Sequence, residues 1–402
     1  MTVRQESLRD KTMELSPIRH DPAAGVLRPL RAAVDARLSV VAVRLTAGTR
    51  WKSKAMLLVL AFSLFRAFPN YNYLRAPGVA GTWERAAIKI ADPAADMARL
   101  FPDTSHEAKL TFRLTVPLAA RVLHLGTVGQ LALFAVAGVL LLLCVLTLAE
   151  GITGSRTVAL YLTLATACTW PGLLAFHQLL GGFYDAVALW LLLLAMAARR
   201  PAIAAAALFA AFWTDERALV AVPLLCLFAV ARSERPRCLA VLVGAAAYLG
   251  SRIWLVHIWA LHSTVGGAGI ALFLRNLHTA PLGVWAGLGG SWILVACALA
   301  ILAARRRYLE FAALLLGIGL VTVSALIVED LTRSLAYALP AVLVALHVLA
   351  KNETPHMVER IAQTTALVCV LLPTWFVQSG DAAWMLPLPV QLIRFLVYPR
   401  LG

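Results

Sequence analysis

The sequence predicts an all-α protein, a bundle of transmembrane helices that crosses a lipid bilayer about eleven times. Of its 402 residues, 61% are hydrophobic and only 14% are charged, whereas soluble domains carry about 25% charged residues. Long apolar runs follow one another with short loops between them, and Lys and Arg gather in alternate loops, as the positive-inside rule predicts. We therefore expect one membrane bundle rather than several soluble domains.

The predicted spans follow the apolar runs in order. A basic arm covers residues 1–53, and no cleavable signal precedes the first apolar run. The bundle covers residues 54–377, with residues 70–111 as a first outer loop that contains short helices, and residues 378–402 as an outer tail. Residues 112–125 read as an interfacial helix because Arg113, Arg121 and His124 interrupt them. The predicted spans are 54–69, 116–148, 158–179, 186–198, 202–214, 218–231, 239–261, 281–304, 309–328, 336–350 and 361–377.

The run 202–231 is divided because Asp215, Glu216 and Arg217 interrupt it. A charged triplet inside hydrocarbon is costly. A single helix here would also place Arg199-Arg200 and Arg232 on opposite sides of the membrane. Two short spans with the triplet at the turn between them agree with both constraints.

The net charge is +15, and the distribution of the basic residues indicates a membrane orientation rather than binding to nucleic acid. If the chain crosses the membrane once in each apolar run, all basic clusters lie on one side, which is the cytoplasmic side. We expect a multi-pass protein of a plasma membrane, specifically a bacterial inner membrane and cell envelope, with a cytoplasmic N-terminus and an extracytoplasmic C-terminus. Membrane lipids are the expected partners, and no soluble partner is implied. These clusters are the arm, Arg156, Arg199-Arg200, Arg232/Arg235/Arg237, Arg305-Arg306-Arg307 and Lys351 with Arg360.

Acids and histidines converge on the opposite side. The first outer loop is the richest segment, with Asp103, His106, Glu107, Lys109 and Arg113. Asp103 or Glu107 is a candidate catalytic base for an attacking hydroxyl, with His106 beside them, and Lys109 and Arg113 suit a leaving phosphate. The alternative is a solvated loop in which Asp103 caps a helix that begins near Thr104 and Glu107 completes a capping box.

Three further loops carry candidate substrate- or phosphate-binding residues. Asp185 either caps the fourth span or contacts substrate, and the charged triplet either marks the water boundary or serves a function. Arg333 in the first turn of the tenth span opposes the helix dipole, which indicates an anionic partner, either an acid beside it or a ligand phosphate. The candidates in these loops are Asp185, Asp215, Glu216, Arg217, Glu329, Asp330 and Arg333.

Neither the cysteines nor the short motifs of the sequence indicate a cofactor. The six cysteines form no CxxC pair, so no metal site or disulfide framework is predicted. No HExxH, Walker or GxSxG motif occurs. No cofactor is predicted with certainty, and a divalent metal ion is compatible with the outer acids.

The order of segments resembles the GT-C superfamily of integral membrane glycosyltransferases, which use polyprenyl-phosphate sugars. The resemblance rests on a cytoplasmic arm, one span, a long acidic first outer loop (Asp92, Asp96, Asp103, Glu107) and many spans with short loops. Asn70-Tyr71-Asn72-Tyr73 stands where that family has paired acids after the first span. The resemblance implies a one-step inverting transfer of sugar to a lipid, glycan or protein acceptor on the extracytoplasmic face. Asp103 or Glu107 would be the base, and Arg333, Arg217 or Lys109 would neutralise the phosphate.

Two other classes remain open. A secondary transporter or lipid flippase would keep charges near a central cavity, but it would place them deeper in the spans and in matching halves. A non-catalytic membrane assembly subunit would not need so many outer acids and cations.

Overall fold

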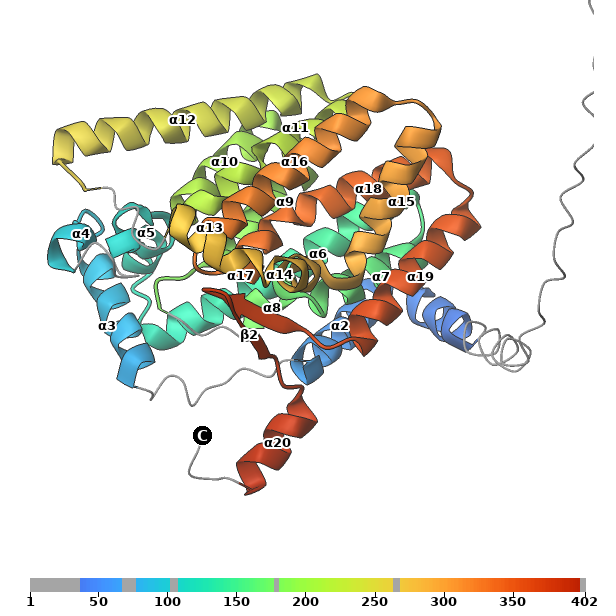
Figure 1. Ribbon diagram of the computed structural model, residues 1–402, viewed down its shortest axis with the longest axis horizontal. Coiled ribbons are helices and arrows are strands. Elements are labelled where there is room, and N and C mark those ends of the chain that lie inside the picture. Colours follow the sequence, from blue (N-terminus) through green and yellow to red (C-terminus); the bar gives the residue numbers. More distant parts are fainter. Residues whose placement is uncertain (1–36, 67–76, 102–107, 177–180, 263–267, 398–402) are drawn as a thin grey trace, which may run out of the picture. The chain divides into compact units, whose positions relative to one another are not determined.

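The computed structural model describes residues 37–66, 77–101, 108–176, 181–262 and 268–397 (Figure 1). The chain divides into two compact units, Met1–Leu45 and Thr46–Gly402. The described part of the first unit, residues 37–45, is helical. The second unit contains all the elements considered below.

The second unit is mostly helical. It begins with α2 (Trp51–Arg66), which α3 (Pro77–Ala91), α4 (Met97–Leu100), the 3-10 helix η2 (Ala108–Phe112) and α5 (Thr115–Val122) follow in the sequence. The bundle continues with α6 (Thr127–Thr153), α7 (Arg156–Ala167), α8 (Trp170–Phe176), α9 (Asp185–Ala197), α10 (Pro201–Thr214), η3 (Glu216–Ala221), α11 (Val222–Ala231), α12 (Arg235–Trp259), α13 (Ile270–Leu277), α14 (Ala280–Leu288), η4 (Gly289–Ser291), α15 (Trp292–Ala304), α16 (Tyr308–Leu326), α17 (Leu331–Leu335), η5 (Ala336–Ala338), α18 (Leu339–Asn352) and α19 (Pro355–Leu371).

Five helical segments among the described residues are long and apolar enough to cross a membrane: Thr127–Thr153, Arg235–Trp259, Ala280–Ala304, Tyr308–Leu326 and Leu331–Asn352. The pair α7 and α8, bent by 65°, makes a sixth if it is one broken span. The apolar helices α9 and α10 are shorter. The predicted helical character is therefore confirmed, and the apolar helices indicate a multi-pass membrane protein, with five candidate spans among the described residues rather than eleven.

The short helix α9 lies inside the bundle. Nearly all its side chains are buried, and it contacts α6, α8 and α10. A helix that is hydrophobic all round belongs in an interior. The long helices α12 and α16 instead expose large apolar side chains, Leu239, Ile253 and Trp254 on α12 and Leu316 on α16, which suits contact with lipid.

Local signals place the helix ends. Gly154 ends α6 with φ +68°, a conformation that glycine adopts without steric cost, and the Ser155 side chain accepts a hydrogen bond from Val158 N as the cap of α7. The predicted interruption at residues 215–217 is present, since α10 ends at Thr214 and Asp215 caps η3 by accepting from Arg217 N.

Two glycines bring α14 against α17. A Cβ added at Gly283 would lie 2.1 Å from Leu331 Cδ2, and one at Gly287 would lie 2.5 Å from Leu335 Cβ. Glycine at both positions permits this approach, because an added side chain would need space that the facing leucines now occupy. The pair thus fixes α17, which carries Arg333.

A β-hairpin follows the last long helix. The sequence predicted a span to residue 377 and then a tail without strands, but α19 ends at Leu371 before Pro373, and β1 (Trp375–Gln378) pairs antiparallel with β2 (Asp381–Trp384). Proline cannot continue the helix, and Ser379 and Gly380 form the turn with φ of +50° and +82°. The last described element is the amphipathic helix α20 (Leu388–Val397).

Candidate functional site

Six charged residues from four regions of the chain meet in one buried cluster. We call Arg113, Asp185, Asp215, Arg217, Asp330 and Arg333 the charge cluster. Arg113 lies between η2 and α5, Asp185 begins α9, Asp215 and Arg217 start η3, and Asp330 and Arg333 stand at the start of α17. The cluster therefore gathers at helix ends rather than in mid-helix.

Asp185 bridges two arginines. Its Oδ1 accepts from Arg217 Nη2, and its Oδ2 accepts from Arg333 Nη2 at 2.7 Å. Asp185 is only 3% exposed and Arg333 only 2%. One carboxylate thus holds η3 and α17 together through separate oxygens, with little water present.

Asp215 is the most enclosed acid of the cluster, with no exposed surface. Its Oδ1 accepts from Arg217 Nε at 2.9 Å and from the Arg217 backbone N at 3.0 Å. Its Oδ2 lies 2.6 Å from Arg217 Nη2 and 3.4 Å from Arg113 Nη2. These contacts satisfy the carboxylate and connect η3 to the segment that leads into α5.

The third acid, Asp330, pairs with Arg333 at 2.5 Å. Arg217 Nη1 also donates to Ser334 Oγ at 3.2 Å. The three guanidinium groups and three carboxylates of the cluster balance in charge. Balance matters because an unpaired charge in a buried site costs several kcal/mol.

Aromatic rings cover the guanidinium groups. The Cζ atoms of Arg113 and Arg333 each lie 5.0 Å from the Phe183 ring centroid, and the Arg217 Cζ lies 5.5 Å from the Tyr337 centroid. At these distances the ring faces attract the cations and exclude water from them.

Some polar atoms at the cluster have no hydrogen-bond partner among the described residues. They are the Nε atoms of Arg113 and Arg333 and the hydroxyl of Tyr337, all buried. Buried donors normally have an acceptor. The cluster therefore has donor capacity beyond what its own carboxylates use.

The first outer loop joins the bundle beside the cluster. Leu114 N donates to Trp213 O at 2.7 Å, Thr115 Oγ1 donates to Ala210 O at 2.7 Å, and Arg113 Nη1 donates to Gly182 O at 3.0 Å. These bonds fix the end of the loop against α10 and against the segment before α9.

Lys89 organises the loop itself. Its Nζ donates to Ala95 O at 2.9 Å and to Thr111 O at 2.8 Å, and the residue is 1% exposed. Burial lowers the pKa of Lys89 to about 8. One ammonium thus connects α3 with the segments around α4 and η2.

A second set of contacts connects this loop to the residues that directly follow α12. Asp96 Oδ2 contacts His262 Nδ1 at 2.7 Å and accepts from His262 N at 3.1 Å, while Arg99 Nη2 donates to Ala260 O at 3.1 Å. Burial alone would raise the pKa of Asp96, but the hydrogen bonds from His262 outweigh it and hold that pKa below its ordinary value.

Six of the predicted site residues form the charge cluster, and three others lie half-buried near it. Glu329 Oε1 accepts from Gln378 Nε2 at 3.2 Å, and Glu216 opens η3. Burial lowers the pKa of Lys109, and the nearby acids Glu329 and Asp330 partly oppose that shift. The remaining three, Asp103, His106 and Glu107, lie outside the described residues.

The structure corrects the capping alternative for Asp185, and Asp330 likewise makes no cap. Asp185 is the first residue of α9, whose cap position is Tyr184 without a side-chain hydrogen bond. Asp330 is at the cap position of α17 but makes no side-chain cap bond either. Both carboxylates bind arginines instead, because a buried guanidinium needs a counter-charge more than a helix end needs a cap.

Sequence reasoning did not single out Phe183, Ser334, Tyr337 or Lys89. The first three are ordinary residues of apolar segments until the fold brings them to the arginines. The only sequence feature that marked Lys89 was its place in a helical segment between acidic residues. That feature is equally typical of a solvent-exposed helix surface.

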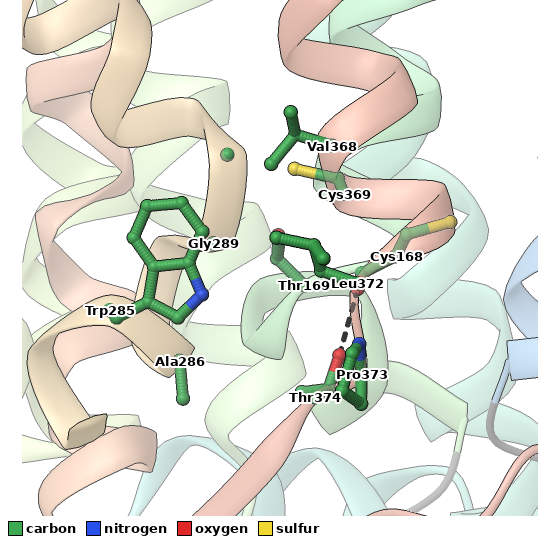
Figure 2. A pocket seen from close by; sticks show the side chains of 11 residues that line it. Cys168, Thr169, Trp285, Ala286, Gly289, Val368, Cys369, Leu372, Pro373 and Thr374 are labelled. Carbon is green, nitrogen blue, oxygen red and sulfur yellow. Dashed lines mark hydrogen bonds between the residues drawn. The ribbon is translucent and has the colours of Figure 1, made fainter.

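A small pocket lies apart from the cluster, between α14, η4, the end of α19 and the residues that join α7 to α8. Figure 2 shows Cys168, Thr169, Trp285, Cys369 and Thr374 around it. Thr374 Oγ1 donates to Cys168 O at 3.3 Å. The lining carries no acid, and the described residues contain no group of three or more His, Cys, Asp or Glu that could hold a metal ion. The charge cluster is therefore the stronger candidate site.

Comparison of the chain with protein-family models, with curated proteins and with solved structures found no match.

Proposed function

We propose that the protein is a membrane glycosyltransferase that moves a sugar from a lipid-phosphate donor to a lipid, glycan or protein acceptor on the extracytoplasmic face. The observation that carries the proposal is the charge cluster, in which Arg113, Arg217 and Arg333 meet at helix ends beside the first outer loop. The proposal includes a GT-C-like arrangement of about eleven crossings, in which α9, α10 and α11 count as short spans and the N-terminus is cytoplasmic.

The chemistry requires fixed positive charge where a phosphate leaves. In the proposed step, Asp103 or Glu107 takes the proton of the acceptor hydroxyl, and the hydroxyl oxygen attacks the anomeric carbon. The bond from that carbon to the phosphate oxygen breaks with inversion, and the lipid phosphate departs as an anion. Arginines suit that anion because their planar N–H groups match phosphate oxygens, and a dry site strengthens the attraction.

Contacts of the first outer loop support the assignment of the base. Ala98 N donates to Thr111 Oγ1 at 3.1 Å, so the chain on either side of residues 102–107 is held together. Lys109, which follows this segment, lies close enough to Glu329 and Asp330 for their charges to influence its pKa. The residue that follows the segment with Asp103 and Glu107 therefore lies near the acids at the proposed phosphate site.

Transfer from radiolabelled polyprenyl-phosphate sugars by purified protein in nanodiscs tests the proposal. We expect transfer by the wild type, its loss in Asp103→Asn or Glu107→Gln, and a strong reduction in Arg217→Lys, which keeps the charge but not the planar fork. The matched control is Asp381→Asn, since Asp381 is an exposed acid in the hairpin, with 90% of its side chain accessible.

The possible outcomes distinguish a glycosyltransferase from a flippase and test the assigned base. Transfer that survives both Asp103→Asn and Glu107→Gln contradicts the assigned base. Absence of transfer from every donor, together with movement of a lipid-linked sugar across the bilayer, would favour a flippase. Adding EDTA to the wild type shows whether a divalent metal ion takes part.

A further inference from the structure

The helix α13 has one exposed apolar face and one anchored polar face. Ile270, Leu274 and Leu277 follow the i, i+4, i+7 spacing and are exposed, Ile270 by 73% and Leu274 by 62%. That spacing puts the three side chains on one side of the helix. An exposed apolar stripe of this kind marks a surface that contacts another molecule or the membrane.

The opposite face of α13 is fixed to the bundle. Asn276 is fully buried, and its Nδ2 donates to Leu326 O at 2.9 Å and to Val328 O at 2.8 Å. Phe273 packs against the buried cluster that Ala325, Leu326, Leu331, Leu335 and Val377 form. The helix therefore cannot turn its apolar stripe inward without breaking these contacts.

The surroundings of α13 indicate what covers the stripe. α13 contacts α16, whose last turns expose Leu320 and Val323. The final turns of α12, the helix that precedes α13 in the sequence, expose Trp254 and Trp259. Both α12 and α16 are long enough to cross a membrane, and exposed tryptophans near the end of a span are typical of the membrane–water interface. The apolar stripe of α13 thus continues the lipid-facing surface of α16 at that interface.

We infer that α13 is an interfacial helix whose stripe of Ile270, Leu274 and Leu277 is embedded in the acyl-chain boundary of the bilayer. Arg275 and His278 on its exposed flank suit the headgroup region. Because Asn276 holds Val328, two residues before Asp330, the bilayer contact also steadies the loop that carries an acid of the charge cluster. The inference concerns the bilayer and does not depend on glycosyl transfer.

Photo-crosslinking tests the inference in the full chain. The photoreactive residue p-benzoylphenylalanine replaces Leu274, Leu316 or Asp92, one position at a time, in nanodiscs of phosphatidylethanolamine and phosphatidylglycerol. Leu316 on the spanning helix α16 is the lipid-facing reference, and Asp92, an exposed acid that follows α3, is the water-facing reference. Mass spectrometry of the irradiated protein then reports covalent lipid adducts.

We expect a lipid adduct at position 274 in a yield comparable to that at position 316, and none at position 92. Adduct at 316 but not at 274 would overturn the inference, as would a crosslinked dimer from position 274, because the stripe would then face a second copy of the chain. Absence of adduct at 316 as well would overturn both the inference and the assignment of α16 as a membrane span.

Discussion

Asp185 is the residue on which the charge cluster depends most. Among the three acids of the cluster, it is the one whose arginine partners, Arg217 in η3 and Arg333 in α17, both lie far from it in the sequence. Removing one partner of a buried ion pair leaves an uncompensated charge, and the loss is typically about 3–5 kcal/mol. Residues of one network also couple, so their losses do not add.

The double variant Asp185→Asn/Arg333→Gln tests this coupling. Each single substitution should lower the free energy of unfolding by about 3–5 kcal/mol, because it leaves the cluster with a net charge. The double variant restores neutrality and should lose less than the sum of the two. Thermal unfolding in nanodiscs measures the effect, with Asp381→Asn as an exposed control; strictly additive losses would contradict a shared network.

Lys89 gives a pH dependence. Its pKa of about 8 lies below its ordinary value of 10.5, so the unfolded chain binds more protons than the folded chain between those two values. Stability should therefore rise as pH increases from 8 to 10.5, by about 3 kcal/mol if the whole shift acts on folding. The neutral amine keeps two N–H groups for Ala95 O and Thr111 O. Unfolding midpoints across this window should rise in the wild type relative to Lys89→Met; parallel curves would refute the prediction.

At the scale of elements, the packing of α14 on α17 positions Arg333. The two glycines that allow the approach differ in what they face. Gly283 faces the end of the flexible Leu331 side chain, whereas Gly287 faces Leu335 Cβ, which cannot move without its backbone. The same added methyl group should therefore have different effects at the two positions.

Gly287→Ala should destabilise the protein by about 1–3 kcal/mol and reduce activity by displacing α17. Gly283→Ala should have a smaller effect, because Leu331 can change rotamer. Gly319→Ala on α16, where an added Cβ has nothing within 4 Å, is the control and should be neutral or slightly stabilising. Unfolding midpoints of the three variants give the ranking, and equal effects at 283 and 287 would disprove the argument.

The sequence allowed the helices to be predicted better than their contacts. Apolar runs and charged breaks placed α10, η3 and α11 correctly, because lipid and core both reject unpaired charge. The hairpin of residues 375–384 was missed since Trp375, Phe376 and Val377 continue an apolar run. The acids and arginines of the cluster were identified as candidates, and an acid beside Arg333 was one of the two alternatives for its partner. The pairs that join different regions, such as Asp185 with Arg217 and Arg333, were not predictable, because they depend on helix packing between residues 32 and 148 positions apart.

At the scale of the whole molecule, the distribution of charge predicts the orientation. The basic loop 305–307 and the hairpin at Asp381 should lie on opposite sides of the membrane. Arg305→Cys and Asp381→Cys, introduced singly, can be treated in intact cells with a membrane-impermeant maleimide. Labelling at 381 without permeabilisation, and at 305 only after it, is expected; the wild type gives the background from its six native cysteines. The reverse pattern would invert the proposed topology.

The arrangement of the charge cluster has a consequence for biosynthesis. Asp215 with Arg217, and Asp330 with Arg333, are pairs of near neighbours in the chain, so each can neutralise itself as its own segment leaves the ribosome. Arg113 and Asp185 have no such local partner within the cluster, and both are synthesised before Arg217. The nascent chain must therefore shelter one lone cation and one lone anion until η3 arrives. Membrane insertion of the N-terminal half should thus be completed only after residue 217 has been made.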